Sequence, residues 1–208
     1  MDRIILMADV VNSHDYDGKT LMNHFQELVK FVNRIFYGAI ESPLTITLGD
    51  EFQGVIDETS NAVTMLFAME EWILENEWDF KLRYVIVEGE IDTAINKESA
   101  HEMLGDGLTR ARQQLGMMKK ETNRFYLSLN DQALTSRLTK SLRLAQHFID
   151  NWQPKDRKTV AGFLNGLDYK ELAKKLGKDD SSVWRRKRSL SIEAYQTCKA
   201  LTEELLDG

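Results

Sequence analysis

Residues 44–56 read LTITLGDEFQGVI, and this stretch decides how the first half of the chain folds. Two short runs rich in Thr, Ile, Val and Phe flank the tip Gly49-Asp50-Glu51. Runs of this kind on either side of a glycine-containing turn are typical of a β-hairpin. The sequence therefore predicts strands over 44–48 and 52–56, joined by a turn that carries two carboxylates.

Strands and helices alternate on both sides of this hairpin. Before it, residues 4–8 read IILMA, an apolar run that ends at Asp9 and is typical of a buried strand. Apolar residues then recur at helical spacing over 19–38. After the hairpin, a second helical pattern runs over 63–74, with Glu70 as the one charged residue in its apolar stripe.

The rest of the chain divides into two parts. A strand over 81–87, a helix over 106–118 and a strand over 124–129 continue the alternation, which favours a sheet with helices packed on it. After residue 131 the pattern is helical only, with a long helix over 132–152 and shorter ones beyond it. We therefore expect an α+β domain at 1–132, followed by an all-α domain at 133–208.

The charge is divided in the same place. The 208 residues carry 27 Lys+Arg and 33 Asp+Glu, a net charge of −6. Residues 1–132 hold 12 basic and 23 acidic residues (−11), whereas residues 133–208 hold 15 and 10 (+5), and the two sum to −6. An acidic unit repels nucleic acid and a basic one attracts it, although chance clustering on solvated faces would give the same split.

Composition excludes several classes of protein. Apolar residues make up 42% and charged residues 29%, as in globular rather than disordered proteins. The single cysteine, Cys198, excludes a disulfide framework and a cysteine-rich zinc site. The sequence contains no run of about 18 apolar residues that would cross a membrane, and residues 1–4 do not read as a signal peptide. We expect a cytoplasmic protein with no membrane partner.

The first candidate site is a pair of carboxylates, Asp9 at the end of the first strand and Asp50 at the hairpin tip. If the two strands are neighbours, both side chains lie at one end of the sheet. Hard oxygen ligands suit Mg²⁺ or Mn²⁺, and Glu51 would add charge. The backbone of residues 12–14, before the first helix, would offer N–H groups to a phosphate. The simpler alternative is that Asp50 is an ordinary turn residue.

Four segments, in order, resemble the motifs of class III nucleotidyl cyclase domains. These are MADVVNS (7–13), TLGDEF (47–52), LRYVIVEGE (82–90) and LGDGLTRAR (104–112). Over most of its length the chain also resembles the SatD family of bacterial proteins, most specifically in LGDEFQG (48–54). The cyclase resemblance implies a ferredoxin-like palm domain, a shared site in a homodimer and a nucleoside triphosphate as ligand.

The resemblance also assigns roles to individual residues. It implies metal ligation by Asp9 and Asp50, with the backbone carbonyl of Val10 beside them. From the residues themselves we expect Glu51 to assist the metal, and the candidate nucleotide contacts are Val10, Asn12, Ser13, Thr109 and Arg112, although Arg112 lies on another helical face than the cyclase residues. The chain also departs from the cyclase motif. Thr109 and Gln113 occupy the positions of a cyclase Asn and Arg that act on the ribose and the transition state. Loss of that Arg removes stabilisation of developing phosphate charge. We expect Arg83 and Glu88 to face neighbouring strands rather than a substrate.

The second candidate site is a helix-turn-helix near the C-terminus. Residues 170–177 read KELAKKLG and residues 178–186 read KDDSSVWRR. The small Ala173 lets two helices cross closely, Gly177 permits a left-handed turn, and Val183 packs back into the crossing. Asp179 is a suitable N-cap for the second helix.

This second helix carries the candidate DNA contacts. Its N-terminal residues would face base edges in the major groove, and its cations would meet phosphates or guanines. The residues expected to do so are Ser181, Ser182, Arg185, Arg186, Lys187 and Arg188. The alternative is a helix-turn-helix that binds protein, with the arginines solvated or paired to the acidic domain.

Three hypotheses for function follow. The first is a regulator in which a metal- and nucleotide-binding, catalytically degenerate cyclase-like domain controls a DNA-binding helix-turn-helix. The second is an active metal-dependent nucleotidyl cyclase or nucleotidyltransferase. The third is a scaffold whose cyclase-like domain serves only for dimerisation.

Overall fold

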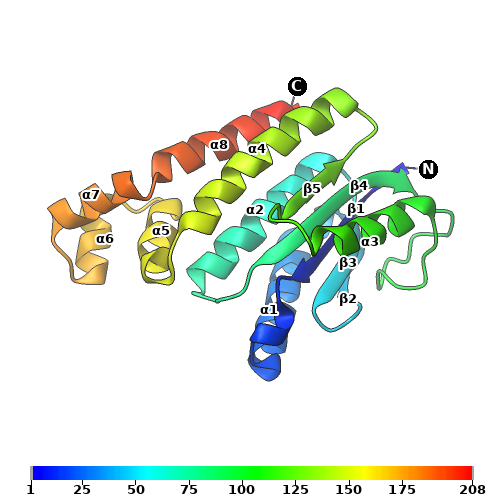
Figure 1. The fold of residues 1–208 in the computed structure, drawn as a ribbon, viewed down its shortest axis with the longest axis horizontal. Coiled ribbons are helices and arrows are strands. Elements are labelled where there is room, and N and C mark those ends of the chain that lie inside the picture. Colours follow the sequence, from blue (N-terminus) through cyan, green and yellow to red (C-terminus); the bar gives the residue numbers. More distant parts are fainter. Residues whose placement is uncertain (1, 208) are drawn as a thin grey trace.

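A computed structural model describes residues 2–207, and within them five strands form one sheet (Figure 1). The strands are β1 (Asp2–Val10), β2 (Ile40–Ile46), β3 (Glu51–Ile56), β4 (Leu82–Glu90) and β5 (Phe125–Ser128). Their order is β2-β3-β1-β4-β5, with β5 parallel to β4 and every other pair antiparallel. The first four strands, with α1 (Gly18–Ile35) after β1 and α2 (Thr59–Glu75) after β3, have the connectivity of a ferredoxin-like fold. The predicted α+β class is confirmed.

The central strand β1 is apolar on both faces because helices cover both faces of the sheet. Ile4, Leu6 and Ala8 pack in a cluster with α1 and α2, whereas Ile5 and Met7 pack in a second cluster with α3 (Asp106–Met118). Successive residues of a strand point to opposite faces, so a strand buried twice reads as a continuous apolar run. This is why the sequence shows no alternation there.

The start of α3 lies directly on the sheet. A Cβ atom on Gly107 would lie 2.7 Å from the Ile5 Cδ1 atom and 2.8 Å from the Gly89 carbonyl carbon. A Cβ atom on Gly89 would lie 2.7 Å from the Gly107 Cα atom. Only a pair of glycines allows this approach, which brings α3 down onto β4.

Three short 3₁₀ turns and five helices complete the described residues. The turns are η1 (Ser13–Asp15), η2 (Tyr37–Ala39) and η3 (Pro154–Asp156). The helices are α4 (Gln132–Asn151), α5 (Arg157–Leu164), α6 (Tyr169–Leu176), α7 (Asp180–Ser189) and α8 (Ile192–Asp207). α4 and α8 run side by side along the molecule, while α6 and α7 lie at one end of this pair (Figure 1).

The C-terminal helices share a core with the sheet domain. Tyr195 of α8 is fully buried between Phe67 of α2 and Trp152, with edge-to-face ring centroids 6.3 and 4.9 Å away. Its hydroxyl donates to Glu71 Oε1 of α2 (2.9 Å). One continuous apolar cluster therefore joins both halves of the chain. The boundary near residue 132, and a separate all-α domain after it, stay predictions.

The predicted element order is confirmed, and the bounds differ in ways that have physical causes. The helix expected over 19–38 ends at Ile35, and the chain continues as the 3₁₀ turn η2 before β2 begins. The strand expected over 4–8 spans Asp2–Val10, because backbone pairing with β4 continues on both sides of the apolar run.

The charged exception in the second helix has a buried partner. Glu70 accepts two hydrogen bonds from Arg124, each 3.0 Å long, and both side chains are almost completely buried. Arg124 also donates to Asp150 of α4 (3.0 Å) and to the Leu82 carbonyl oxygen at the start of β4. Burial alone would lower the pKa of Arg124, but Glu70 and Asp150 raise it above its ordinary value. This network joins the sheet to α2 and α4.

We predict that Arg124→Met lowers the free energy of unfolding by about 3–5 kcal/mol, because Glu70 is left as a buried charge without its partner. The double variant Arg124→Met/Glu70→Leu should recover most of this loss, since no buried carboxylate then remains at position 70. Urea denaturation measures both. Lys120→Met, at an exposed position, is the control and should change stability by no more than about 0.5 kcal/mol. Equal losses in the single and double variants would contradict the assignment.

Candidate functional site

The predicted carboxylates lie at one end of the sheet, where β1 ends and β3 begins. Asp9 is directly opposite Glu51 of β3 on one side and Arg83 of β4 on the other. The Val10 N–H donates to the Asp50 carbonyl oxygen (2.9 Å), so the hairpin tip adjoins the end of β1. Directly opposed residues share a face of a sheet, and Met7, two residues before Asp9, packs under α3. Asp9, Glu51 and Arg83 therefore lie on the face that α3 covers.

The Asp9 carboxylate is fully engaged in an ion pair. Arg83 donates from Nε to one oxygen (2.8 Å) and from Nη2 to the other (2.9 Å). The Nζ atom of Lys119, the residue after α3, lies 3.7 Å from the second oxygen. Asp9 is 2% exposed and Arg83 is 7% exposed, so this is a buried, bidentate pair. The prediction that Arg83 faces a neighbouring strand is confirmed.

Glu51 has weaker partners. Thr47 Oγ1 donates to its carboxylate (3.3 Å), and Arg112 Nε of α3 lies 3.9 Å away. Arg112 also donates from Nη2 to Gln53 Oε1 (2.9 Å). Burial raises the pKa of Glu51, and the opposing charge of Arg112 only partly offsets this. We call Asp9, Glu51, Gln53, Arg83, Arg112 and Lys119 the sheet-end cluster.

The sheet-end cluster does not fit a divalent cation as its side chains are placed. Both Asp9 oxygens already accept from a guanidinium, and a metal there would leave Arg83 as a buried charge without a partner. Within residues 2–207, no group of three or more His, Cys, Asp or Glu side chains is arranged to hold a metal. Metal ligation by Asp9, Asp50 and Glu51 stays a prediction.

Of the predicted nucleotide contacts, only Arg112 has its side chain in this cluster. Asn12 is an exposed residue in the left-handed region (φ 51°) that precedes η1, and Ser13 is the first residue of that turn. Thr109 is exposed on α3, and its hydroxyl donates to the Gly105 carbonyl oxygen (3.1 Å). At Val10 only the backbone faces the hairpin tip, through its N–H, because the Val10 side chain is buried in the core. Nucleotide binding by these residues stays a prediction.

The N-terminus of the first helix already has an anionic partner. The Asp17 carboxylate accepts from the Thr20 N–H (2.9 Å) and from its hydroxyl (2.7 Å), and these hydrogen bonds lower the pKa of Asp17. A phosphate bound at this helix end would compete with that carboxylate. The expected phosphate-binding role of residues 12–14 therefore has no support from the helix that follows them.

The second candidate site consists of α6, the turn after it and α7, which we call the α6–α7 unit. Asp168 and Glu171 form a reciprocal capping box at the start of α6. Gly177 ends α6 in the left-handed conformation (φ 63°), as such a turn requires. Asp179 caps α7 by accepting from the Ser182 N–H (3.0 Å). Ala173 and Val183 are buried where the two helices meet, as predicted.

The side chains of α7 divide into an outer and an inner set. Ser181, Ser182, Trp184, Arg185 and Arg188 are exposed on the outer side. On the inner side, Arg186 donates to the buried Asp156 (3.1 and 2.5 Å).

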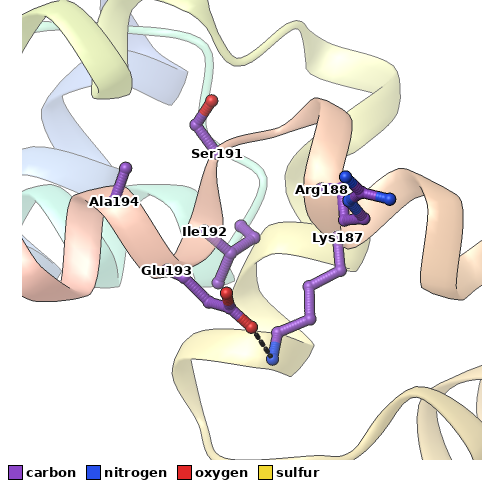
Figure 2. A pocket seen from close by; sticks show the side chains of 6 residues that line it. All are labelled: Lys187, Arg188, Ser191, Ile192, Glu193 and Ala194. Carbon is purple, nitrogen blue, oxygen red and sulfur yellow. Dashed lines mark hydrogen bonds and ion pairs between the residues drawn. The ribbon is translucent and has the colours of Figure 1, made fainter.

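Lys187, the next residue, also has an internal partner. Figure 2 shows it reaching from α7 to Glu193 of α8 (3.1 Å), whereas Arg188 points away from that pair. Lys187, Arg188 and Glu193 line a hollow of about 250 Å³ at the junction of α7 and α8. The structure thus gives Arg186 and Lys187 internal partners, while Arg185 and Arg188 point outward.

A model of the SatD family matches residues 3–206. The chain belongs to the SatD family. A search of the curated proteins finds no match for this SatD chain. The match includes both the sheet-end cluster and the α6–α7 unit, so family membership applies to the two candidate sites together.

Among solved structures, the SatD chain is similar to adenylyl and guanylate cyclases. Two chains of a bacterial light-regulated adenylyl cyclase align with TM-scores of 0.43 and 0.42 at 12% and 13% identity, and each alignment covers 61% of this chain. The alignments cover 74% and 43% of those chains. The guanylate cyclase domain of RhGC from Catenaria anguillulae, in complex with GTP, aligns with a TM-score of 0.38 at 17% identity. That alignment covers 55% of this chain and 72% of the RhGC chain.

Sequence reasoning about this SatD chain did not identify Asp9 as the partner of Arg83, and it missed Lys119 altogether. The signal for Arg83 was the one charged residue within LRYVIV (82–87), and the register that brings it to Asp9 came only from the fold. Lys119 gave no signal, because it is one of two adjacent lysines at the end of a helix. Within residues 2–207, no helix combines the length and apolar character needed to span a bilayer.

We predict that Glu51 makes the SatD chain less stable as pH rises. Its pKa is higher in the folded state than the unfolded value near 4.5, so the folded state binds the proton more tightly. The free energy of unfolding therefore falls as pH rises from the unfolded pKa through the folded pKa. Glu51→Gln should lack this part of the fall, as urea denaturation between about pH 4 and pH 7 would show. The control is Glu121→Gln, at an exposed position. Superimposable profiles for wild type and Glu51→Gln would refute this.

Proposed function

We propose that this SatD-family protein binds double-stranded DNA, with the α6–α7 unit as a helix-turn-helix and α7 as the recognition helix. The observation that carries the proposal is the division of α7 into two sides. Its inner side is held by buried Val183 and by the Arg186–Asp156 ion pair, while its outer side leaves two arginines and two serines exposed. A recognition helix needs this combination of rigid placement and free polar side chains.

The local charge supports a polyanionic partner. Residues 168–191 contain eight Lys+Arg and four Asp+Glu, a net charge of +4 on a chain whose total is −6. Lys170, Lys174, Lys175 and Lys178 are exposed on α6 and the turn after it. Exposed lysines beside a recognition helix can contact phosphates, which supply affinity without sequence preference.

The first turn of α7 determines what the helix could read. The Ser182 hydroxyl can donate to or accept from either base pair, and the Ser181 hydroxyl, which donates to Asp179 Oδ1 (2.5 Å), can accept. Arg185 and Arg188 suit the O6 and N7 atoms of guanine. Asp180 is exposed in the same turn and can accept from a cytosine amino group. Asp179 has a different role, because hydrogen bonds from Ser181 and Ser182 occupy it and lower its pKa.

We predict that Arg185→Ala/Arg188→Ala weakens DNA binding by at least about tenfold, because each good contact with a base contributes roughly 1–3 kcal/mol. Fluorescence anisotropy with fragmented genomic DNA of the source organism, at about 50 mM salt, measures it. For the wild type, affinity should fall steeply as salt rises.

The matched control for this experiment is Lys30→Ala/Arg34→Ala, which removes two exposed cations from α1. It has the same change in net charge and should bind DNA like the wild type. Equal weakening by both double variants would show a nonspecific charge effect. No binding by the wild type at low salt would favour the alternative, a helix-turn-helix that contacts protein.

We also propose that the sheet domain is catalytically degenerate. Cyclase chemistry at the end of β1 needs free carboxylates, whereas Asp9 is held by Arg83 and Lys119. Thr109 and Gln113 stand where the resemblance places an Asn and a transition-state Arg. The second function that we propose for the sheet-end cluster is nucleotide binding without catalysis. Arg112 lies 3.9 Å from Glu51, and Lys119 lies 3.7 Å from Asp9. Both cationic side chains are more than half exposed, so both can turn to the phosphates of a nucleotide.

We predict no turnover of any nucleoside triphosphate with Mn²⁺, measured by chromatography of the products. A triphosphate should nevertheless raise the melting temperature, and Arg112→Ala/Lys119→Ala should abolish that rise because a ligand stabilises only the state it binds. Lys120→Ala is the control for loss of a nearby exposed cation. Product formation that is lost in Asp50→Asn would instead establish the active enzyme. No thermal shift would leave the scaffold hypothesis.

A further inference from the structure

A long apolar groove lies between α4 and α8. Its volume is about 700 Å³, and its apolar lining residues are Leu144, Phe148, Ala194, Cys198, Leu201 and Leu205. The side chains of Leu144 and Leu201 flank it, and these residues are 59% and 52% exposed. Large apolar side chains gathered on one face mark an interaction surface more often than leucines that lie singly.

We propose that a second copy of this chain closes the groove, so that α4 and α8 of two copies form a four-helix bundle. On α4 the groove-lining positions are 140, 141, 144 and 148, and on α8 they are 194, 197, 198, 201, 204 and 205. Spacings of three and four residues make a helical seam of the kind that packs against another helix pair. α8 already buries its other side, with Tyr195 and Thr202, in its own core.

The charges at one end of the groove select the arrangement. Lys140 and Glu204 line the end far from the α6–α7 unit. Neither side chain has an ion pair or hydrogen bond to another side chain described in residues 2–206. A twofold axis parallel to the helices places α4 of one copy against α8 of the other. Lys140 then meets the partner's Glu204, and the symmetry makes this contact twice.

The same axis fixes where the two α6–α7 units lie. Both would sit at the same end of the bundle, because rotation about an axis along the helices does not exchange their ends (Figure 1). This step rests on the proposed DNA binding. Two recognition helices on one side of a dimer read two DNA half-sites. The half-sites lie one turn of the DNA helix apart, about 34 Å, or a multiple of that distance. An axis across the groove would instead place the units at opposite ends.

The test is the mass of the full chain in solution. The wild type should run in multi-angle light scattering at twice the 24.0 kDa of one chain. Leu144→Glu/Leu201→Glu should raise the dimer dissociation constant at least about 100-fold, because it places four carboxylates in an apolar contact. Far-UV circular dichroism checks that the variant is folded.

A charge exchange tests the arrangement. Lys140→Glu and Glu204→Lys should each weaken the dimer about tenfold, and the two together should restore it, because opposite charges then face each other again. Lys30→Glu is the control at an exposed position outside the groove. A restored dimer supports the parallel axis, and additive weakening overturns it.

Three results would overturn the proposed dimer. One is a monomeric wild type, whether its groove is open or holds a small apolar molecule seen by native mass spectrometry. The second is a dimer that the two glutamates leave intact. The third is a larger mass due to another protein. Arg185→Ala/Arg188→Ala should lose DNA while keeping the dimer mass, so failure of the dimer and failure of DNA binding are distinguishable.

Discussion

The buried guanidinium of Arg124 is the interaction on which the rest of this structure depends. It lies directly before β5 and joins Glu70 of α2, Asp150 of α4 and the carbonyl oxygen of Leu82 in β4. A charge so deeply buried is tolerated only when its donors are satisfied, so these elements have little freedom to move apart. The network therefore fixes α4, and with it the helices that follow, against the sheet.

The sheet-end cluster lies beside this network along β4. The Leu82 carbonyl accepts from Arg124, and the next residue, Arg83, pairs with Asp9. Lys81 pairs with Asp150 (2.9 Å) at the same end. Cations and carboxylates alternate over β1, β3 and β4 and over helices α2, α3 and α4, so this end of the sheet is held together by internal ion pairs.

The α6–α7 unit uses its cations differently. Arg186 pairs with the buried Asp156, and this contact holds α7 in place, whereas Lys187 pairs with the exposed Glu193. Arg185 and Arg188 lie on the other side of the helix and stay exposed. α8 begins three residues after α7 ends and packs on α2 and α4, so the unit is continuous with the core.

The sequence alone determined the element order, the α+β class and the helix ends at Gly177 and Asp179, because these follow from local spacing, capping and turn chemistry. It also predicted that Asp9 and the hairpin tip come together. Only the tertiary structure decided what those carboxylates do, since strand register sets Arg83 opposite Asp9 and α3 brings Lys119 and Arg112 over them. Likewise, four consecutive cations at 185–188 look equivalent in sequence, and only the packing of α7 separates the two that pair with carboxylates from the two that stay exposed. Long-range pairing is a property of the fold, and no local pattern contains it.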